Sequence, residues 1–166
     1  MTVREPELDR RLHTFVSTCR EKGLKATHQR MEIFREIAGS QEHPDAEAVY
    51  QKVRLRVPAI SRDTVYRTLA MLEDHGLIRK AEALSGSTRF DANTDLHHHF
   101  ICTVCGAIKD FYSPAMNELP LPDSVRSLGT IESAQVQVRG ICADCANGRR
   151  ASGLARGRSG RQRQPE

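Results

Sequence analysis

The sequence predicts an α+β fold, in which a helical winged helix-turn-helix unit precedes a smaller α/β unit. Apolar residues repeat at helical spacing through the first half, in four segments separated by capping residues, glycine and proline. Residues 77–84 and 87–91 then have the composition of two strands joined by a turn at 85–87. Four helices followed by a hairpin are typical of a winged helix-turn-helix.

Three of the four helices of the first half have a start signal of their own. Thr27, Asp45 and Ser61 can cap the second, third and fourth helices, because their side chains accept hydrogen bonds from free backbone N–H groups. The helix after Ser61 is expected to be the recognition helix. The inward face of the first helix is predicted to carry an apolar stripe with a buried thiol: Leu8, Leu12, Phe15, Val16 and Cys19.

The second unit is expected to hold short strands around two cysteine pairs. The segments HHHFICTVC and AIKDFY predict strands that flank the first pair, and IESAQVQVRGIC predicts a strand that leads into the second. A short helix is expected over 114–119. The predicted organisation is a first unit at 1–88, a hinge at 89–92, a second unit at 93–146 and a tail at 147–166.

Composition places the chain among globular proteins. Hydrophobic residues make up 39% and charged residues 28%. The start, MTVREPELDR, is too charged for a signal peptide, and no apolar run approaches the roughly 20 residues of a membrane helix. We therefore expect a cytoplasmic protein with no membrane partner.

The positive charge is concentrated in the tail. From Asn147 onward there are six Arg and one Glu, so the tail has a net charge of +5. The rest of the chain has a net charge of −1, and the whole chain one of +4. The tail has almost no large apolar residues and is expected to be disordered. It is either a solvated appendage or a source of non-specific attraction to phosphates.

Four of the five cysteines form two C-x-x-C pairs, Cys102/Cys105 and Cys142/Cys145. Each pair can sit on a tight turn that directs two sulfurs at one ion, and Zn²⁺ with four thiolates keeps no open position. Such a site is structural, because it holds together a small unit with little core. Redox-active dithiols are the alternative, but they usually lie at a helix start in a βαβ setting. Both pairs here follow strands, which favours zinc.

A second cluster offers nitrogen and oxygen. His97 and His99 are two residues apart and share one face of a strand. Asp91 upstream and Asp110 on the next strand are close enough to converge with them. Histidine with aspartate suits Fe²⁺, Mn²⁺ or Zn²⁺ better than Ca²⁺ or Mg²⁺. Exposed strand histidines are a fair alternative, and spacing alone favours a solvent-exposed His43.

Five segments together resemble the successive signature segments of the ferric uptake regulator family, in that family's order and spacing. They span roughly residues 8–146 and comprise GLKATHQR, HPDAEAVY, ISRDTVYRTLAMLEDHGLI, RFDANTDLHHHFICTVCGAIKDF and GICADC. The resemblance implies a winged-helix DNA-binding domain, an α/β dimerisation domain and a homodimer that represses at double-stranded operator DNA. It implies a regulator rather than an enzyme.

The resemblance also assigns metal ligands. Structural zinc falls on Cys102, Cys105, Cys142 and Cys145. The regulatory site, for Fe²⁺ or Mn²⁺, falls on His43, Asp91, His97, His99 and Asp110. A third site of some relatives needs a histidine late in the dimerisation domain. No histidine follows His99, so that site is expected to be absent.

Two aspartates help to indicate which stimulus the repressor responds to, peroxide or a metal ion. Asp at both 91 and 110 resembles the peroxide-sensing members, whereas Val65-Tyr66-Arg67 resembles the iron-uptake branch. The favoured hypothesis is a repressor released when peroxide oxidises His43 or His97. An iron-, manganese- or zinc-responsive uptake repressor is the runner-up. A metalloenzyme is a third possibility, but nothing supplies a general base beside an open coordination position.

The expected DNA contacts lie on and near the recognition helix. Tyr66 can pack on thymine methyls and Arg67 can reach guanine edges or phosphates. Ser61 and Thr64 near the helix start favour phosphate. Lys25 matches a family position that can enter an A·T-rich minor groove. The alternatives are a solvated Arg67 and a partly buried Tyr66 ring.

Overall fold

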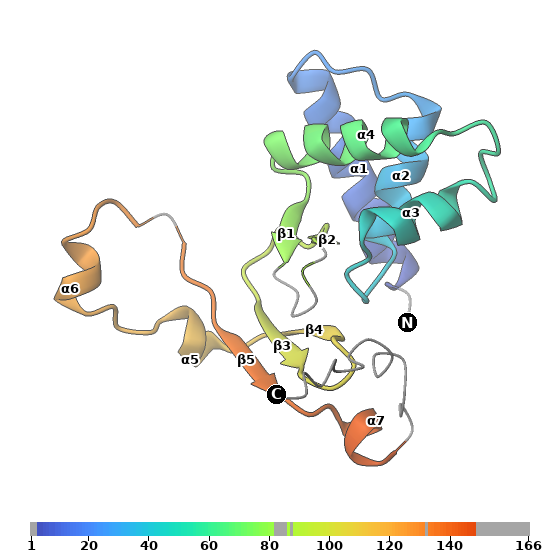
Figure 1. Cartoon of the computed structure of the whole chain (residues 1–166). Coiled ribbons are helices and arrows are strands. Elements are labelled where there is room, and N and C mark those ends of the chain that lie inside the picture. The colour runs from blue at the N-terminus through green and yellow to red at the C-terminus, as the bar shows by residue number, and fades with distance from the viewer. Residues whose placement is uncertain (1–2, 82–85, 87, 132, 149–166) are drawn as a thin grey trace, which may run out of the picture.

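A computed structural model describes residues 3–81, 86, 88–131 and 133–148. Its first unit contains four helices, α1 (Glu5–Glu21), α2 (His28–Ala38), α3 (Ala46–Val53) and α4 (Arg62–Asp74). An antiparallel pair of strands, β1 (Arg79–Ala81) and β2 (Arg89–Asp91), follows. In Figure 1 this pair lies between the four helices and the sheet of the second unit. The helices and the wing confirm the predicted α+β class.

All three predicted caps form. Thr27 Oγ1 accepts from the Arg30 N–H at 3.4 Å, and Asp45 Oδ1 accepts from the Ala48 N–H at 2.8 Å. Ser61 Oγ accepts from the Thr64 N–H at 3.1 Å. These caps determine where α3 and α4 begin. The Asp45 cap therefore also sets the point at which the loop that carries His43 ends.

Replacing Ser61 by alanine should lower the free energy of unfolding by about 1 kcal/mol, because the Thr64 N–H loses its acceptor. Urea unfolding of the two proteins measures the difference. Ser17→Ala is the matched control, since the Ser17 hydroxyl bonds back to the His13 and Thr14 carbonyls within α1 and caps no helix. We expect that control to change stability by less than about 0.5 kcal/mol. Equal losses in both variants would contradict a capping role.

The main core lies among the four helices. Phe15 of α1 stacks on Phe34 of α2 with ring centroids 4.8 Å apart, and Cys19 is buried beside them. Val16 was predicted to face inward, but its side chain is 43% exposed. It is rotated about 100° around the helix from Phe15, which stacks on α2, the element that packs most extensively against α1.

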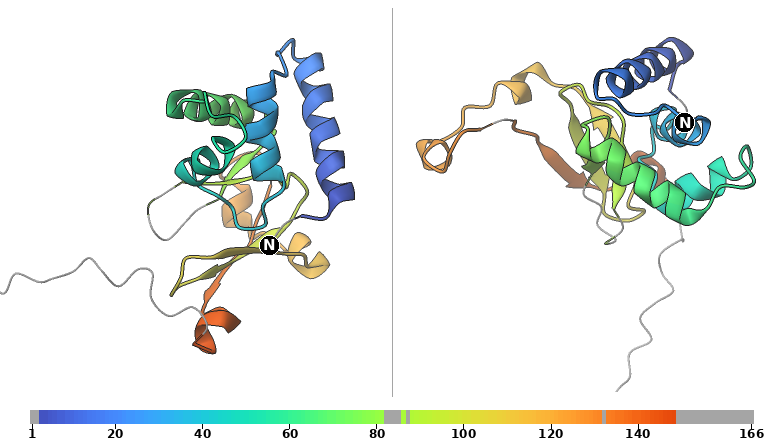
Figure 2. Two further views of the ribbon diagram at one scale, coloured as in Figure 1. Left: turned by 90° about the vertical axis from the view of Figure 1, so that its right-hand side faces the viewer. Right: turned by 90° about the horizontal axis from the view of Figure 1, so that it is seen from above.

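The second unit is built on a three-stranded sheet in the order β4-β3-β5. Strand β3 (His98–Cys102) pairs antiparallel with β4 (Ile108–Phe111) and parallel with β5 (Gln137–Gly140). Three one-turn helices accompany it: α5 (Pro114–Asn117), α6 (Asp123–Arg126) and α7 (Ala143–Ala146). Only α5 was predicted. Figures 1 and 2 show the α5–α6 segment projecting away from the sheet.

The second unit has little apolar core. Among the described residues, the buried cluster there consists of Ile101 and Ile108, together with Ala81 of β1 in the first unit. Among the described residues, no helix is long and apolar enough to cross a membrane. The expected tail from 149 onward lies outside the described residues, as does most of the turn at 85–87. Strand β2 occupies three of the four residues expected to form the hinge.

Candidate metal centres

His43 lies in the loop between α2 and α3 and is held in an uncommon conformation. Its φ is +48°, in the left-handed region that a non-glycine residue occupies at some cost. Strand β2 holds this loop. The Phe90 N–H donates to the Pro44 carbonyl at 3.0 Å, and Arg89 Nη1 donates to the His43 carbonyl at 3.4 Å. His43 is thereby buried, with 3% exposure, and not solvent-exposed as its spacing alone suggested.

His97 and His99 face the same side of the sheet. Their Nε2 atoms are 2.9 Å apart, while His98 points to the other side and packs on Phe111. His97 Nδ1 lies 2.8 Å from the Asp95 carbonyl. A proton on Nδ1 satisfies this contact and leaves the Nε2 lone pair for the cluster.

Two carboxylates complete the cluster. Asp110 stands opposite His99 in the β3–β4 register, and its Oδ1 is 2.9 Å from His43 Nε2. Asp91 Oδ2 is 2.9 Å from His97 Nε2. One donor atom from each of the five side chains lies within 4.8 Å of all the others. The structure therefore brings together all five residues that the sequence singled out for the regulatory site.

The electrostatics of the cluster are those of paired opposite charges. Burial lowers the pKa of His43, but Asp110 and Asp91 outweigh burial and raise it to about 9. Burial raises the pKa of Asp91, yet the three histidine rings beside it bring that pKa far below its usual range. The carboxylates are therefore ionised and available as ligands.

The donor set fits a transition-metal ion. His43 Nε2 is buried and close to two carboxylates, but it makes no well-aligned hydrogen bond. A metal ion in place of the Nε2 proton would give this nitrogen a partner at the centre of the cluster. Three imidazole nitrogens and two carboxylate oxygens suit Fe²⁺, Mn²⁺ or Zn²⁺.

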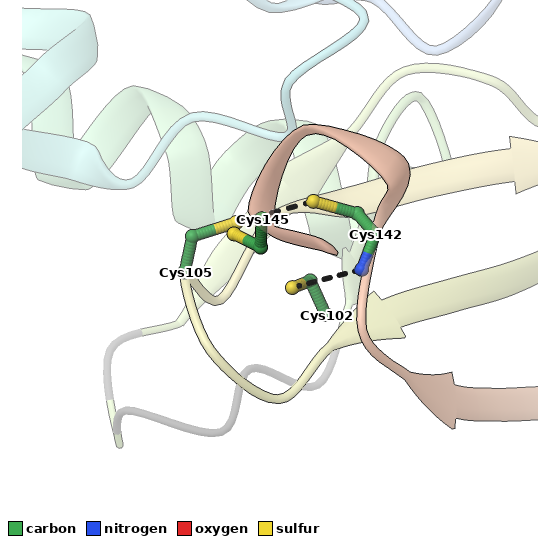
Figure 3. A group of neighbouring side chains, drawn as sticks. All are labelled: Cys102, Cys105, Cys142 and Cys145. Carbon is green, nitrogen blue, oxygen red and sulfur yellow. Dashed lines mark hydrogen bonds between the residues drawn. The ribbon is translucent and has the colours of Figure 1, made fainter. Parts of the chain in front are cut away.

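The four cysteines form the second cluster, shown in Figure 3. Cys102 ends β3, Cys105 lies in the turn that follows, and Cys142 and Cys145 flank the start of α7. Cys105 Sγ and Cys142 Sγ are 3.9 Å apart. This separation is far from a disulfide bond. It matches the spacing of about 3.8 Å that follows from four sulfurs about 2.3 Å from one zinc ion.

Backbone groups prepare one of these sulfurs as a ligand. Burial raises the pKa of Cys102, but backbone N–H groups, first that of Cys142, outweigh burial and lower it. The Cys142 N–H donates to Cys102 Sγ at 3.3 Å (Figure 3). A lowered pKa favours the thiolate, which is the metal-binding form.

The side chains expected to contact DNA lie on the accessible face of α4 and in the loop before α2. Tyr66 is 53% exposed, and Arg67 is paired with Asp63 at 2.9 Å. The Ser61 and Thr64 hydroxyls are 2.9 Å apart, and Lys25 is exposed. Ser61 also caps α4, and Arg67 is in an exposed ion pair with Asp63. Apart from these two contacts, the residues expected to contact DNA are free to approach a duplex.

Sequence reasoning missed Asn93. It is 3% exposed, and its side-chain amide donates to Asp110 Oδ2. The available signal was its position two residues after Asp91, where asparagine and aspartate often form local side-chain-to-backbone turns.

Residues 21–136 match the ferric uptake regulator family. The chain belongs to this family. A peroxide-responsive repressor, PerR, of Staphylococcus aureus is 31% identical over 145 residues, which cover 87% of this chain and 98% of that relative. The family's members are metal-responsive transcriptional regulators that bind DNA as dimers. This family membership makes the chain a regulator of that class rather than an enzyme.

Solved structures of family members share the fold. The Campylobacter jejuni peroxide stress regulator superimposes with a TM-score of 0.64 at 26% identity, covering 78% of this chain and 98% of that one. A zinc-bound manganese uptake regulator superimposes with a TM-score of 0.60 at 29% identity, covering 76% and 96%. A regulator of the peroxide response and a regulator of manganese uptake are thus similar to this chain to a comparable degree.

Proposed function

We propose that the chain is a homodimeric, metal-dependent repressor that leaves its operator when peroxide oxidises His43 or His97. One observation carries the proposal: His43, from the α2–α3 loop of the first unit, lies 2.9 Å from Asp110 of the second. An ion held by this cluster joins the DNA-binding unit to the dimerisation unit. For these units we propose 1–88 and 93–146, with a hinge at 89–92 and a tail at 147–166.

The two clusters take different metals. Zinc is held by Cys102, Cys105, Cys142 and Cys145. Fe²⁺ or Mn²⁺ is held by His43, Asp91, His97, His99 and Asp110. The absence of a histidine after His99 argues against a third site.

Joining the two units controls DNA binding through geometry. In a symmetric dimer the two α4 helices must fit half-sites that repeat at about 34–36 Å per helical turn. An ion that fixes each DNA-binding unit on its dimerisation unit selects the arrangement that fits. A coupling free energy of roughly 1–3 kcal/mol is typical of such a shift.

Exposed apolar side chains support a second copy as the partner of the dimerisation unit. Leu128 is 84% exposed and Ile141 is 59% exposed, and others follow the α5–α6 segment and β5. Exposed side chains of this kind, in a unit with little core of its own, favour burial between protomers. DNA then meets α4, where we propose contacts from Ser61, Thr64, Tyr66 and Arg67, together with Lys25.

The peroxide step changes a ligand. Fe²⁺ held by the five ligands would activate hydrogen peroxide for this reaction, in which Mn²⁺ and Zn²⁺ are far less effective, and the ring that is oxidised would supply the two electrons. In the net reaction the imidazole ring of His43 or His97 gains one oxygen atom, and the second oxygen leaves as water. An oxidised ring is a poorer ligand, so the connection between the two units opens and the operator is released.

The runner-up is an uptake repressor with the same architecture and no response to peroxide. The similarity to a manganese uptake regulator supports it. The ligand types favour the peroxide sensor, because Asp at both 91 and 110 resembles the peroxide-sensing branch. The similarity to the peroxide-responsive relative supports the same choice.

Operator binding by anaerobically iron-loaded protein, before and after about one equivalent of hydrogen peroxide, separates the two hypotheses. We expect the iron form alone to release the operator and to gain one oxygen atom on a peptide that contains His43 or His97. Manganese-loaded protein is the control and should stay bound and unmodified. If the iron form stays bound and unmodified, the chain is a metal-uptake repressor.

A further inference from the structure

We infer that Asn93 is a positioning residue that limits each carboxylate of the His/Asp cluster to one metal-binding oxygen. The inference rests on the proposed function, in which this cluster holds the regulatory ion. Asn93 lies between β2 and β3, 3% exposed, and it contacts Asp91 and Asp110 through different groups. It is not one of the five ligands.

The backbone of Asn93 anchors Asp91. The Asn93 N–H donates to Asp91 Oδ1 at 2.7 Å. The other oxygen, Oδ2, is the one that lies 2.9 Å from His97 Nε2 inside the cluster. One oxygen is thus held outside the cluster and the other faces the ligand nitrogens.

The side chain of Asn93 does the same for Asp110. Its Nδ2 donates to Asp110 Oδ2 at 3.2 Å, while Asp110 Oδ1 lies 2.9 Å from His43 Nε2. The same Nδ2 also donates to the Tyr112 hydroxyl at 2.8 Å. An amide nitrogen has two hydrogens, so both are used and the orientation of the amide is determined.

These contacts decide how many donors the cluster offers. A carboxylate can bind a metal through one oxygen or two. With one oxygen of each aspartate held by Asn93, the five side chains supply three nitrogens and two oxygens. That is one donor fewer than the six of an octahedral site, so one position remains for a small ligand.

The cluster has a route to solvent on the side of Asn93. Asp91, Asn93, Asp110 and Tyr112 all line a cleft of about 1130 Å³ between the start of α1 and the β3–β4 turn. Asp110 is the most accessible of the five ligands, with 26% of its side chain exposed. Asn93 therefore acts on the ligand that borders the entrance.

A purely structural role for Asn93 makes a different prediction. If the residue only shapes the turn between β2 and β3, its loss lowers stability and leaves the metal's coordination unchanged. Coordination number and stability must therefore be measured separately.

Co²⁺ titration of the zinc-loaded dimer makes this distinction, because Co²⁺ absorbs more weakly in the visible range as its coordination number rises. Asn93→Ala keeps the backbone N–H that holds Asp91 but frees Asp110 Oδ2 to bind the ion. We expect weaker visible bands from Asn93→Ala than from the wild type. The near-ultraviolet thiolate bands report any exchange of Co²⁺ into the cysteine site.

Two further variants make the test specific. Tyr112→Phe removes only the second partner of the Asn93 amide, on a residue that is 64% exposed, and should give an intermediate spectrum. Asn117→Ala removes an exposed amide on α5 and should match the wild type. In the iron form, Asn93→Ala should also slow oxidation by peroxide roughly tenfold to hundredfold, the usual range for losing a partner of a metal ligand.

Each outcome decides the inference. Wild-type bands in Asn93→Ala would overturn it, whatever the change in stability and whatever the bands of Tyr112→Phe. If Asn93→Ala does not fold, unchanged bands in Tyr112→Phe overturn it and intermediate bands support it. If the wild type binds no Co²⁺ beyond the cysteine site, the proposed function fails first, and the role of Asn93 fails with it.

Discussion

Cys142→Ser should lose its zinc and unfold the second unit while the four-helix unit remains folded. Cys142 Sγ lies 3.9 Å from Cys105 Sγ, and its backbone N–H donates to Cys102 Sγ, so the residue contributes twice to the cluster. Among the described residues, the buried apolar cluster of the sheet has only three members, Ala81, Ile101 and Ile108. Zinc binding contributes about 10–16 kcal/mol in small zinc-stabilised domains, so losing one ligand outweighs what this core supplies.

Zinc content by mass spectrometry, thermal unfolding and sedimentation together measure this effect. We expect loss of zinc, loss of the dimer and a separate low-temperature unfolding transition. Cys19→Ala is the matched control, because Cys19 is buried among the helices of the first unit. That variant should keep its zinc and its dimer. A dimeric Cys142→Ser protein with unchanged melting would show that the cysteines have no structural role.

His43→Ala should abolish the metal dependence of operator binding while the zinc site and the dimer persist. His43 is the ligand from the first unit, and its Nε2 lies 2.9 Å from Asp110 and 3.6 Å from Asp91. Without it, four ligands remain within the second unit and the strand next to it. An ion bound there no longer holds the DNA-binding unit in place. Operator affinity in saturating Mn²⁺ should fall roughly 5- to 150-fold, the range of a typical coupling free energy.

Fluorescence anisotropy of labelled operator DNA, with and without Mn²⁺, measures the loss. His13→Ala, on the exposed side of α1, is the control and should retain the full response to Mn²⁺. The metal-free affinity of His43→Ala should equal that of metal-free wild type, because only the coupling is removed. A His43→Ala protein that still responds to Mn²⁺ would mean that the ion acts without joining the two units.

Local features of this fold could be predicted because their causes lie within a few residues. The caps at Thr27, Asp45 and Ser61 formed as expected, since each side chain bonds an N–H three residues ahead. His97 and His99 share a face because side chains alternate along extended chain. Val16 and the one-turn helices α6 and α7 were missed, because burial and very short helices depend on what packs against them.

The sequence by itself determined the family, the helical half with its wing, and the ligand types of both clusters. Only the tertiary structure decided that His43 is buried, because the β2 contacts that hold its loop join residues more than forty positions apart. It also decided which oxygen of Asp110 faces the cluster, because the amide of Asn93, in the connection between β2 and β3, bonds the other oxygen of Asp110 on β4. Spacing along the chain specifies which donors are present, whereas their direction depends on contacts between distant segments.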